Sequence, residues 1–592
     1  DGAQTAMDCD GTHRSNKRFA RREKKATYSP ERCPPYRRTM ISPNSFRFCQ
    51  NPALAVGAFA LSLALAGCAA PVRAASQPVA CEAATPPVPN EFSGIDIPAT
   101  QIDAAVAQVD VLAQKLMTSS GIPGMAVAVV RDGKTVFAKG YGVRSLDTGV
   151  PVDADTVFQL ASMSKSIGAS VIAHQVGAGV VGWDTRVQKL MPAFKLNEWY
   201  ASSNATIGDL YAHRSGLPEH IGDLLEDLGF DRAQILGKLR HAPLAPFRAH
   251  YAYTNFGMTA AAEAVAIASG ADWETLSQQA LYAPLGMNST SSRYADFVAR
   301  ANRAVGHVKD GNRFVVTPSQ RDPDAQSPAG GVSSSVNDVA RWMSMVLAGG
   351  CANGTQWIPG AALLPATSPQ VVSGAPSNPR ARAGFYGYGF NVGESGSGRV
   401  VLSHSGAFAL GAATAFTLIP SAKVGIVTLT NALPIGVPET LNADFADLVQ
   451  FGHIAQPWDA LYAGAFRGLL APTGAHACKV KPNDGSLDCP SPPANATPAQ
   501  PLMNYAGRYA NDFYGPADVL IAGDALELRI GPLGMRFPLS HWDGNVFLMV
   551  PPGESATPGS RSMVRFANNT MTIEYMNDDG LGVFQSTRRP QP

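Results

Sequence analysis

Strand patterns lie at both ends of segment 98–450, and a long helical region separates them. Apolar residues at helical spacing predict a helix over 101–117, and the pattern is mostly helical from about 160 to 300. Strand patterns occur in six segments: 125–130, 135–143, 386–393, 400–406, 411–419 and 424–431. The first two are joined by an Asp132-Gly133 hairpin signal. This order predicts one mixed sheet completed late in the chain, without the regular strand–helix alternation of parallel α/β folds.

The C-terminal part has a different pattern. Residues 451–503 are rich in proline and alanine, which predicts a linker with some helix. From 504 to 592, short strand patterns alternate with Asp and Gly turns. This predicts a small antiparallel barrel or sandwich that folds as a second domain.

The N-terminal residues resemble protein-targeting signals. Residues 1–39 are basic and lack an opening methionine, which indicates an upstream non-structural extension; the alternative is a disordered arm. Residues 40–68 contain the apolar run ALAVGAFALSLALA, which suits a signal peptide but is too short for a bilayer span. The run ends in Leu-Ala-Gly-Cys, so Cys68 is the candidate lipidated residue. Residues 69–97 are predicted to be a flexible tether.

Both interpretations of the signal predict export. A lipid on Cys68 would anchor the chain in the periplasm, and Ala69 at the next position resembles outer-membrane lipoproteins. The alternative is cleavage after Ala74, which gives a soluble periplasmic or secreted protein. The chain has 47 lysines and arginines against 46 acidic residues. Its net charge is therefore too small to attract nucleic acid. Nucleic acid is therefore not an expected partner, and the membrane is one only through the lipid.

The cysteines also fit an oxidising compartment. Cys478 and Cys489 flank a polar loop, KVKPNDGSLD, and are predicted to form a disulfide; the alternative is two free thiols. No pair has Cys-x-x-Cys spacing, so neither a metal site nor thioredoxin-type chemistry is expected.

A first catalytic motif is Ser162-Met163-Ser164-Lys165, which follows a strand pattern and opens a helical one. A helix start places Ser162 and Lys165 one turn apart on the same face. A serine becomes a nucleophile when a base takes its proton. Lysine can do this only if burial lowers its pKa far below the ordinary value of about 10.4. Taken alone, Lys165 fits a solvated helix lysine better than a catalytic base.

A second motif is Tyr253-Thr254-Asn255. A tyrosine with a lowered pKa can pass protons, and an asparagine can hold both a lysine and a substrate amide. Taken alone, the motif also fits an aromatic turn packed on the core.

A third motif is His404-Ser405-Gly406, at the end of the strand pattern 400–406. A strand beside a site can pair with an extended substrate, and Gly406 lets the backbone come close. The following N–H group, on Ala407, can point at an oxyanion. Taken alone, His404 also fits a structural histidine with satisfied hydrogen bonds.

In this order the three motifs resemble the serine β-lactamase and penicillin-binding-protein superfamily. The similarity is closest to class C β-lactamases, DD-peptidases, D-aminopeptidases and related esterases. Further motifs of the family are resembled by segments 205–220, 282–290 and 328–342. The resemblance covers about 98–450 and implies an α+β fold of the β-lactamase/transpeptidase type, an antiparallel sheet flanked by helices plus an all-helical subdomain. Residues 504–592 resemble an appended lipocalin-like β-barrel, which in such proteins caps the site or supports homo-oligomers.

The resemblance also implies residue roles. Ser162 would be acylated, Lys165 and Tyr253 would handle its proton, and Asn255 would orient the substrate. The N–H groups of Ser162 and Ala407 would form the oxyanion hole, and His404 and Ser405 would line the far wall. No cofactor is implied.

One departure concerns substrate charge. Most β-lactamases have Lys-Thr-Gly where this chain has His-Ser-Gly, and a histidine of ordinary pKa is mostly neutral at pH 7. Strong β-lactamase activity is therefore disfavoured. Arg399 is a candidate replacement cation for carboxylate binding; the alternative is an exposed arginine.

The predicted function is an exported serine hydrolase that forms an acyl-enzyme with β-lactam, D-amino-acid peptide or ester substrates, either small molecules or fragments of peptidoglycan. The alternatives are a penicillin-binding sensor or pseudoenzyme that acylates without turnover, and a surface protein with a retired site.

Overall fold

The structure is a computed structural model, and it describes residues 79–83, 86–481, 483–554 and 556–587. The predicted extension, the predicted signal peptide, the candidate lipidation site Cys68 and the first part of the predicted tether lie outside these residues. Within them, no helix is both long and apolar enough to cross a bilayer.

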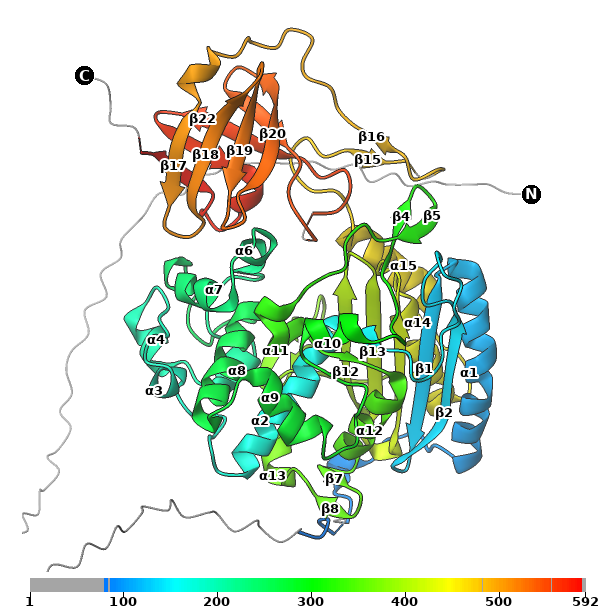
Figure 1. Ribbon diagram of the computed structural model, residues 1–592. Helices are drawn as coiled ribbons and strands as arrows, with labels where there is room; N and C mark the ends of the chain where they lie inside the picture. The colour runs from blue at the N-terminus through cyan, green and yellow to red at the C-terminus, as the bar shows by residue number, and fades with distance from the viewer. Residues whose placement is uncertain (1–78, 84–85, 482, 555, 588–592) are drawn as a thin grey trace, which may run out of the picture. The chain divides into compact units, whose positions relative to one another are not determined.

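An eight-stranded sheet forms the centre of the first domain (Figure 1). Its strand order is β2-β1-β14-β13-β12-β11-β10-β9, and every neighbouring pair runs antiparallel, so the sheet is not mixed. In spatial order the strands are β2 (Lys134–Gly142), β1 (Gly124–Arg131), β14 (Val424–Thr430), β13 (Ala412–Ile419), β12 (Val400–Phe408), β11 (Asn391–Glu394), β10 (Gly384–Tyr386) and β9 (Val371–Gly374).

The first hairpin closes as the sequence predicts. Asp132 and Gly133 have φ angles of 49° and 75°, which suit the tight turn between β1 and β2. The predicted strand 386–393 is wrong in one respect, because β10 ends at Tyr386 and β11 begins at Asn391. Gly389, with φ of 80°, lies between them, and a β-carbon there would lie 2.5 Å from the Lys165 carbonyl oxygen.

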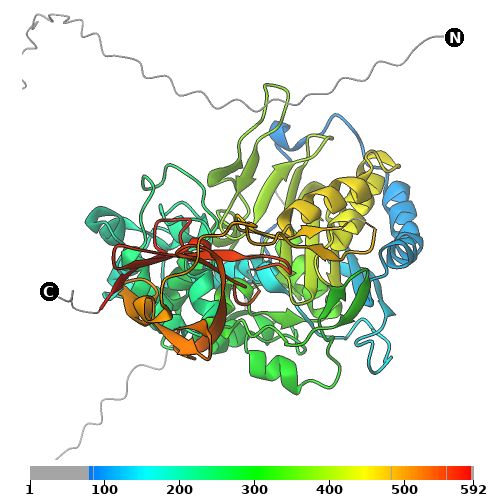
Figure 2. The same ribbon diagram turned by 90° about the horizontal axis from the view of Figure 1, so that it is seen from above.

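Strand β1 is apolar on both faces because it separates two cores. Met125, Val127 and Val129 join the core under helices α1 (Ala99–Ser120) and α14 (Val437–Phe451). The alternate residues of β1 face the larger core on the other side, which includes helix α12 (Val336–Leu347). Figure 2 shows α1 and α14 side by side against the sheet.

The helical region supplies the other wall of the site. Its main helices share extensive buried contacts and include α2 (Ser164–Gly177), α5 (Ile207–Tyr211), α7 (Arg232–Lys238), α8 (Asn255–Ser269), α9 (Trp273–Ser277) and α11 (Ser327–Gly330). Helix α2 is buried all round, with almost every side chain from Ser164 to Ala173 inaccessible to solvent. This burial fixes the helix that carries the first motif.

The C-terminal domain is a closed eight-stranded antiparallel barrel, in which β17 pairs with both β18 and β24. It follows helix α15 (Trp458–Leu469) and the remaining linker. Its strands are β17 (Gly507–Asn511), β18 (Gly515–Ala522), β19 (Ala525–Ile530), β20 (Met535–Asp543), β21 (Val546–Met549), β22 (Ser562–Ala567), β23 (Thr570–Ile573) and β24 (Val583–Ser586).

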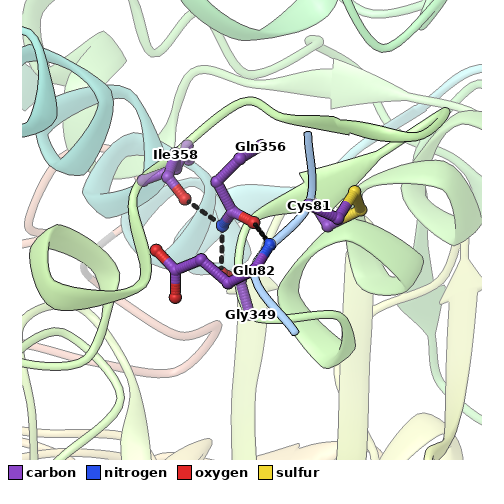
Figure 3. Close-up of a disulfide and its surroundings, with 6 residues drawn as sticks. Cys81, Glu82, Gly349, Gln356 and Ile358 are labelled. Atoms are coloured by element: carbon purple, nitrogen blue, oxygen red, sulfur yellow. Dashed lines mark hydrogen bonds between the residues drawn. A yellow bond between two sulfur atoms is a disulfide. The ribbon is translucent and has the colours of Figure 1, made fainter. Parts of the chain in front are cut away.

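Two disulfides are present among the described residues. Cys478 and Cys489, the pair predicted from sequence, are bridged. The second bridge joins Cys81 to Cys351, 270 residues away, and the sequence reasoning missed it (Figure 3). The backbone N–H of neighbouring Glu82 donates to Gln356 Oε1 at 2.9 Å. Residues 81 and 82 of the predicted tether are therefore attached to the first domain by a disulfide and a hydrogen bond.

Candidate active site

Ser162 lies in a short turn between strand β3 (Phe158–Gln159) and helix α2. The preceding residue, Ala161, has a φ of 48°, a conformation that costs a non-glycine residue about 1 kcal/mol or more. Ser164 fixes this turn: its hydroxyl donates to the Ala161 carbonyl at 2.6 Å and accepts from the Val332 N–H at 2.9 Å. The nucleophile is therefore held on a strained backbone that the hydrogen bonds of Ser164 keep in place.

Lys165 connects the first two motifs. Its Nζ lies 3.0 Å from Ser162 Oγ, 2.7 Å from Asn255 Oδ1 and 2.9 Å from the Ala329 carbonyl oxygen. The two carbonyl acceptors match the two N–H groups of a neutral amine. The third direction, where such an amine has its lone pair, points to Ser162.

The charge of Lys165 suits a base. Its side chain is fully buried, and this burial lowers its pKa to about 7, against the opposing attraction of the Asp223 carboxylate. A substantial share of the amine is then neutral near pH 7. The chemistry expected of the Ser-x-x-Lys pattern is available in this environment.

Tyr253 contacts the nucleophile from the other side. Its hydroxyl donates to Ser162 Oγ at 2.8 Å. Burial raises the pKa of Tyr253, so the expectation of a lowered tyrosine pKa is wrong for this structure. The phenol is a proton donor at rest, and Lys165 is the group able to accept the serine proton.

Gly406 is the point where strand β12 meets the nucleophile. A β-carbon at this position would lie 2.1 Å from the Leu160 carbonyl oxygen and 2.9 Å from the Ser162 nitrogen. The pairing of β12 with β11 ends at Ser403, so the β11-side edge of the strand is unpaired beside Ser405 and Ala407. This edge is available to an extended substrate, and the N–H groups of Ser162 and Ala407 are the candidate oxyanion donors.

His404 is buried and doubly hydrogen-bonded. Its Nδ1–H donates to the Ser405 carbonyl at 2.7 Å, and its Nε2 accepts from the Tyr386 hydroxyl at 2.9 Å. Burial lowers the pKa of His404 to about 3, with a further contribution from the Lys165 charge. The expected neutrality at pH 7 holds, but the titration near pH 6.5 assumed from the ordinary value does not.

Arg399 lies away from this group. Its guanidinium donates to the Ile95 carbonyl oxygen, and it lines a separate hollow with Arg131 and Lys423. The candidate role in binding a substrate carboxylate is therefore wrong, because β12 carries Arg399 toward its opposite end.

Asp223 is a site residue that sequence reasoning missed. It accepts from Asn255 Nδ2 at 2.9 Å and pairs with His220 Nδ1 at 3.0 Å. The signal was present in the sequence, since His220 ends the family-like segment 205–220 and Asp223 follows three residues later, but no spacing rule connects them to Asn255. Ala329, an acceptor for Lys165, lies in the segment 328–342 already noted for its resemblance.

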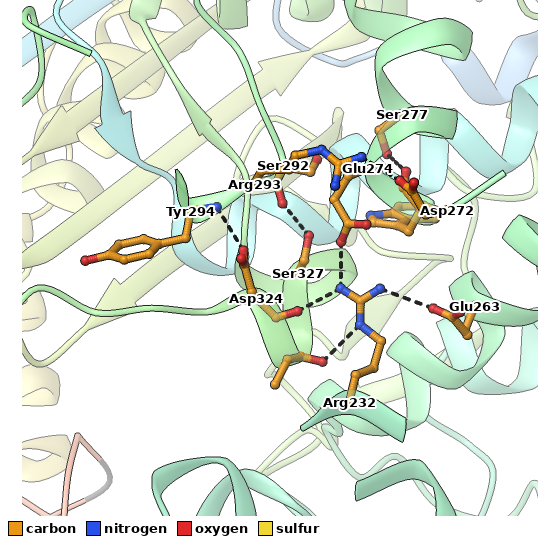
Figure 4. Close-up of polar contacts among 12 residues, drawn as sticks. Arg232, Glu263, Asp272, Glu274, Ser277, Ser292, Arg293, Tyr294, Asp324 and Ser327 are labelled. Atoms are coloured by element: carbon orange, nitrogen blue, oxygen red, sulfur yellow. Dashed lines mark hydrogen bonds and ion pairs between the residues drawn. The ribbon is translucent and has the colours of Figure 1, made fainter. Parts of the chain in front are cut away.

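A partly buried arginine supports the segment that carries Ala329 (Figure 4). Arg232 donates to the Asp324 and Ala325 carbonyl oxygens at 2.7 and 3.3 Å. It also pairs with Glu274 at 2.6 Å and Glu263 at 3.2 Å, so it ties α7 to α8 and α9. The Ala329 carbonyl, which accepts from Lys165, is thus positioned by a network of residues that do not themselves contact Lys165.

The site opens into a cavity of about 920 Å³. Ser162, Tyr253, Asn255, Ser405 and Ala407 line it from the first domain, and segments of the barrel line it from the other side. No group of three or more His, Cys, Asp or Glu side chains in the described ranges is arranged to hold a metal ion.

Comparisons with known proteins show what this chain is similar to. A family model described as Beta-lactamase matches residues 109–451, and a domain of unknown function, DUF3471, matches residues 491–591. An unguisins hydrolase of Aspergillus violaceofuscus is 26% identical over 68% of this chain and 74% of its own length. Penicillin-binding protein 4 of Amycolatopsis lactamdurans is 28% identical over 40% of this chain and 62% of its own.

A solved structure shows the same fold. The octameric penicillin-binding protein homologue from Pyrococcus abyssi superposes with a TM-score of 0.53 at 20% identity, covering 79% of this chain and 98% of that one.

Proposed function

Because this chain belongs to the beta-lactamase family, we propose that it is an exported serine hydrolase that forms an acyl-enzyme on Ser162. The observation that carries the proposal is the contact of a buried, pKa-lowered Lys165 with Ser162 at 3.0 Å. A structural lysine would gain nothing from a site that favours its neutral form.

In the acylation step, the Lys165 amine takes the Ser162 proton as Oγ attacks the substrate carbonyl carbon. The carbonyl π electrons move to oxygen, where the N–H groups of Ser162 and Ala407 stabilise the negative charge. Collapse breaks the bond to the leaving group. That group takes the Tyr253 hydroxyl proton, and Lys165 returns a proton to Tyr253, so the net transfer is from serine to leaving group.

Deacylation reverses these transfers with water. Water gives a proton to the Tyr253–Lys165 pair as its oxygen attacks the acyl carbon. The ester bond to Ser162 breaks, and Oγ recovers a proton from the same pair. Each step uses groups already within 3.0 Å of Ser162 Oγ.

The proposed substrates are β-lactams, D-amino-acid peptides or esters. A panel of nitrocefin, p-nitrophenyl acetate and butyrate, D-Ala-D-Ala peptides and D-aminoacyl anilides separates these classes. Unguisins, the substrate in the name of one relative, extend the panel. A burst followed by steady turnover supports the hydrolase, whereas a stoichiometric burst alone favours a penicillin-binding sensor.

The test of the nucleophile is labelling with fluorescent penicillin or a fluorophosphonate. The wild type should be labelled, and Ser162→Ala should abolish both labelling and turnover. Ser421→Ala, at a surface turn outside the cavity, is the matched control. Labelling that persists in Ser162→Ala would overturn the assignment.

Export and lipidation at Cys68 form part of the same proposal. The two disulfides support it, because such bonds persist in oxidising compartments. Mass spectrometry of the mature N-terminus tests it: an acylated Cys68 is expected, and a product beginning at Ala75 would show cleavage by the alternative route.

A further inference from the structure

A buried ion cluster lies on the cavity wall that the barrel contributes to. Arg321 Nη2 lies 2.6 Å from Glu226 Oε2, and Arg321 Nε lies 2.7 Å from Glu554 Oε2. The side chains of Arg321 and Glu554 are each only 13% exposed. Glu226 and Arg321 belong to the first domain, whereas Glu554 belongs to the loop between barrel strands β21 and β22.

The cluster contacts strands β3 and β12, which lie beside the nucleophile. Gln159, three residues before Ser162, donates from Nε2 to the Arg321 carbonyl at 2.8 Å. The Arg321 guanidinium lies 5.6 Å from the ring centre of Phe408, the neighbour of Ala407. Ser162, Arg321 and Glu554 all line the same cavity.

The barrel loop is shaped to reach this position. Gly553 has a φ of 70°, and a β-carbon there would lie 2.6 Å from the carboxylate carbon of Asp227. Only glycine combines this backbone conformation with this close approach. The next residue, Glu554, is thereby placed against Arg321.

Arg321 is a permanent cation, since an arginine does not lose its proton in a protein. It is also the one Lys or Arg side chain that lines the cavity in the described part of the chain. His404 is neutral, and Arg399 lies elsewhere. A carboxylate-bearing substrate therefore has one permanent cation to bind, and Glu226 and Glu554 already occupy its Nη2 and Nε edges.

We propose that Glu554 is a specificity-determining residue: it occupies Arg321 from the barrel and so excludes substrates that carry a carboxylate. This inference rests on the proposed hydrolase function of Ser162. It assigns the barrel a role in substrate selection, in which an internal carboxyl group takes the place that an acidic substrate would need.

The test compares two p-nitrophenyl esters that share a leaving group, the uncharged butyrate and the carboxylate-bearing hemisuccinate. The measured quantity is the ratio of their kcat/KM values, hemisuccinate over butyrate. Glu554→Ala should raise this ratio about five- to thirtyfold, the gain expected from one new charge-assisted hydrogen bond. Glu554→Gln, which keeps the space filled, should give a smaller gain.

Two further variants make the result specific. Asp518→Ala removes a barrel carboxylate that pairs with Arg508 and does not line the cavity, and it should leave the ratio unchanged. Adding Arg321→Gln to Glu554→Ala should abolish the gain. The inference is overturned if Glu554→Ala leaves the ratio within twofold of wild type, or if the gain persists without Arg321.

The failure of this inference is distinguishable from that of the proposed function. If butyrate hydrolysis survives in Ser162→Ala, the hydrolase assignment itself is wrong. If that hydrolysis needs Ser162 and only the ratio stays constant, Glu554 is a structural contact between the two domains.

Discussion

The Tyr386 hydroxyl donates a hydrogen bond to Nε2 of His404 at 2.9 Å. Since Nδ1–H of the same ring donates to the Ser405 carbonyl, both ring nitrogens are satisfied in the neutral form. A proton on Nε2 would bury a positive charge and place it near Lys165. The third motif thus presents a fixed, uncharged imidazole beside the substrate strand.

This pairing predicts that His404 does not titrate between pH 5 and 8. Its ring ¹⁵N chemical shifts should stay constant over that range, because burial lowers its pKa to about 3. Tyr386→Phe should lower the free energy of unfolding by about 1–2 kcal/mol, since it leaves a buried acceptor without a donor. The control is Tyr200→Phe at a 57% exposed tyrosine, which urea unfolding should show to be nearly neutral. A His404 titration near pH 6.5 would contradict the prediction.

The lowered pKa of Lys165 predicts the pH dependence of ester hydrolysis. Its neutral form is the active base, so kcat/KM should rise as pH increases through about 7 and then level off. Lys165→Arg should be nearly as inactive as Lys165→Ala at every pH, because arginine keeps its proton. If Lys165→Arg restores most of the activity, Lys165 is an electrostatic anchor and not a base.

Asp223 should control the position of that pH profile. Its carboxylate favours the protonated form of Lys165 and so opposes the effect of burial. Asp223→Asn should therefore lower the Lys165 pKa and move the acid limb of kcat/KM to lower pH, while an amide oxygen can still accept from Asn255. Asp518→Asn on the barrel surface is the control. A limb that stays in place would show that Asp223 acts only by orienting Asn255.

The sequence predicted the fold and most of the residues that surround the nucleophile. Periodicity located α1 and the strands of the hairpin, and the ordered motifs located Ser162, Lys165, Tyr253 and Asn255, which the structure brings together. These predictions succeed because each depends on local pattern or on motifs that a whole family shares.

The errors come from long-range placement. The pKa of Tyr253 rises because the assembled core buries it, which no local pattern shows. Arg399 is close to the third motif in sequence, but a β-strand separates residues along its length, so it lies at the other end of β12. The Cys81–Cys351 bridge and the Arg321–Glu554 pair join segments that are far apart in the chain, and their spacing carries no signal.

The two disulfides should contribute unequally to stability. The Cys81–Cys351 bridge closes a loop of 270 residues and the Cys478–Cys489 bridge one of 11, so the first restricts the unfolded chain more. Replacing Cys81 and Cys351 with serine should cost about 2–5 kcal/mol, and replacing Cys478 and Cys489 less. Calorimetry of both double variants measures this. Equal losses would show that native contacts, and not loop length, determine the effect.

Gly406 provides the sharpest test of the site geometry. Gly406→Ala would place a β-carbon 2.1 Å from the Leu160 carbonyl oxygen and 2.9 Å from the Ser162 nitrogen, so β12 must move away from the nucleophile. Because Ala407 is the next residue, the two candidate oxyanion donors would separate. The loss of one such donor typically costs about 10²- to 10³-fold in kcat.

The matched control is Gly393→Ala on neighbouring β11, where a β-carbon meets nothing within 4 Å. Steady-state hydrolysis of p-nitrophenyl butyrate should fall at least a hundredfold in the first variant and stay within about twofold in the second. If Gly406→Ala keeps wild-type kcat while remaining folded, the oxyanion is held elsewhere and Ala407 has no part in it.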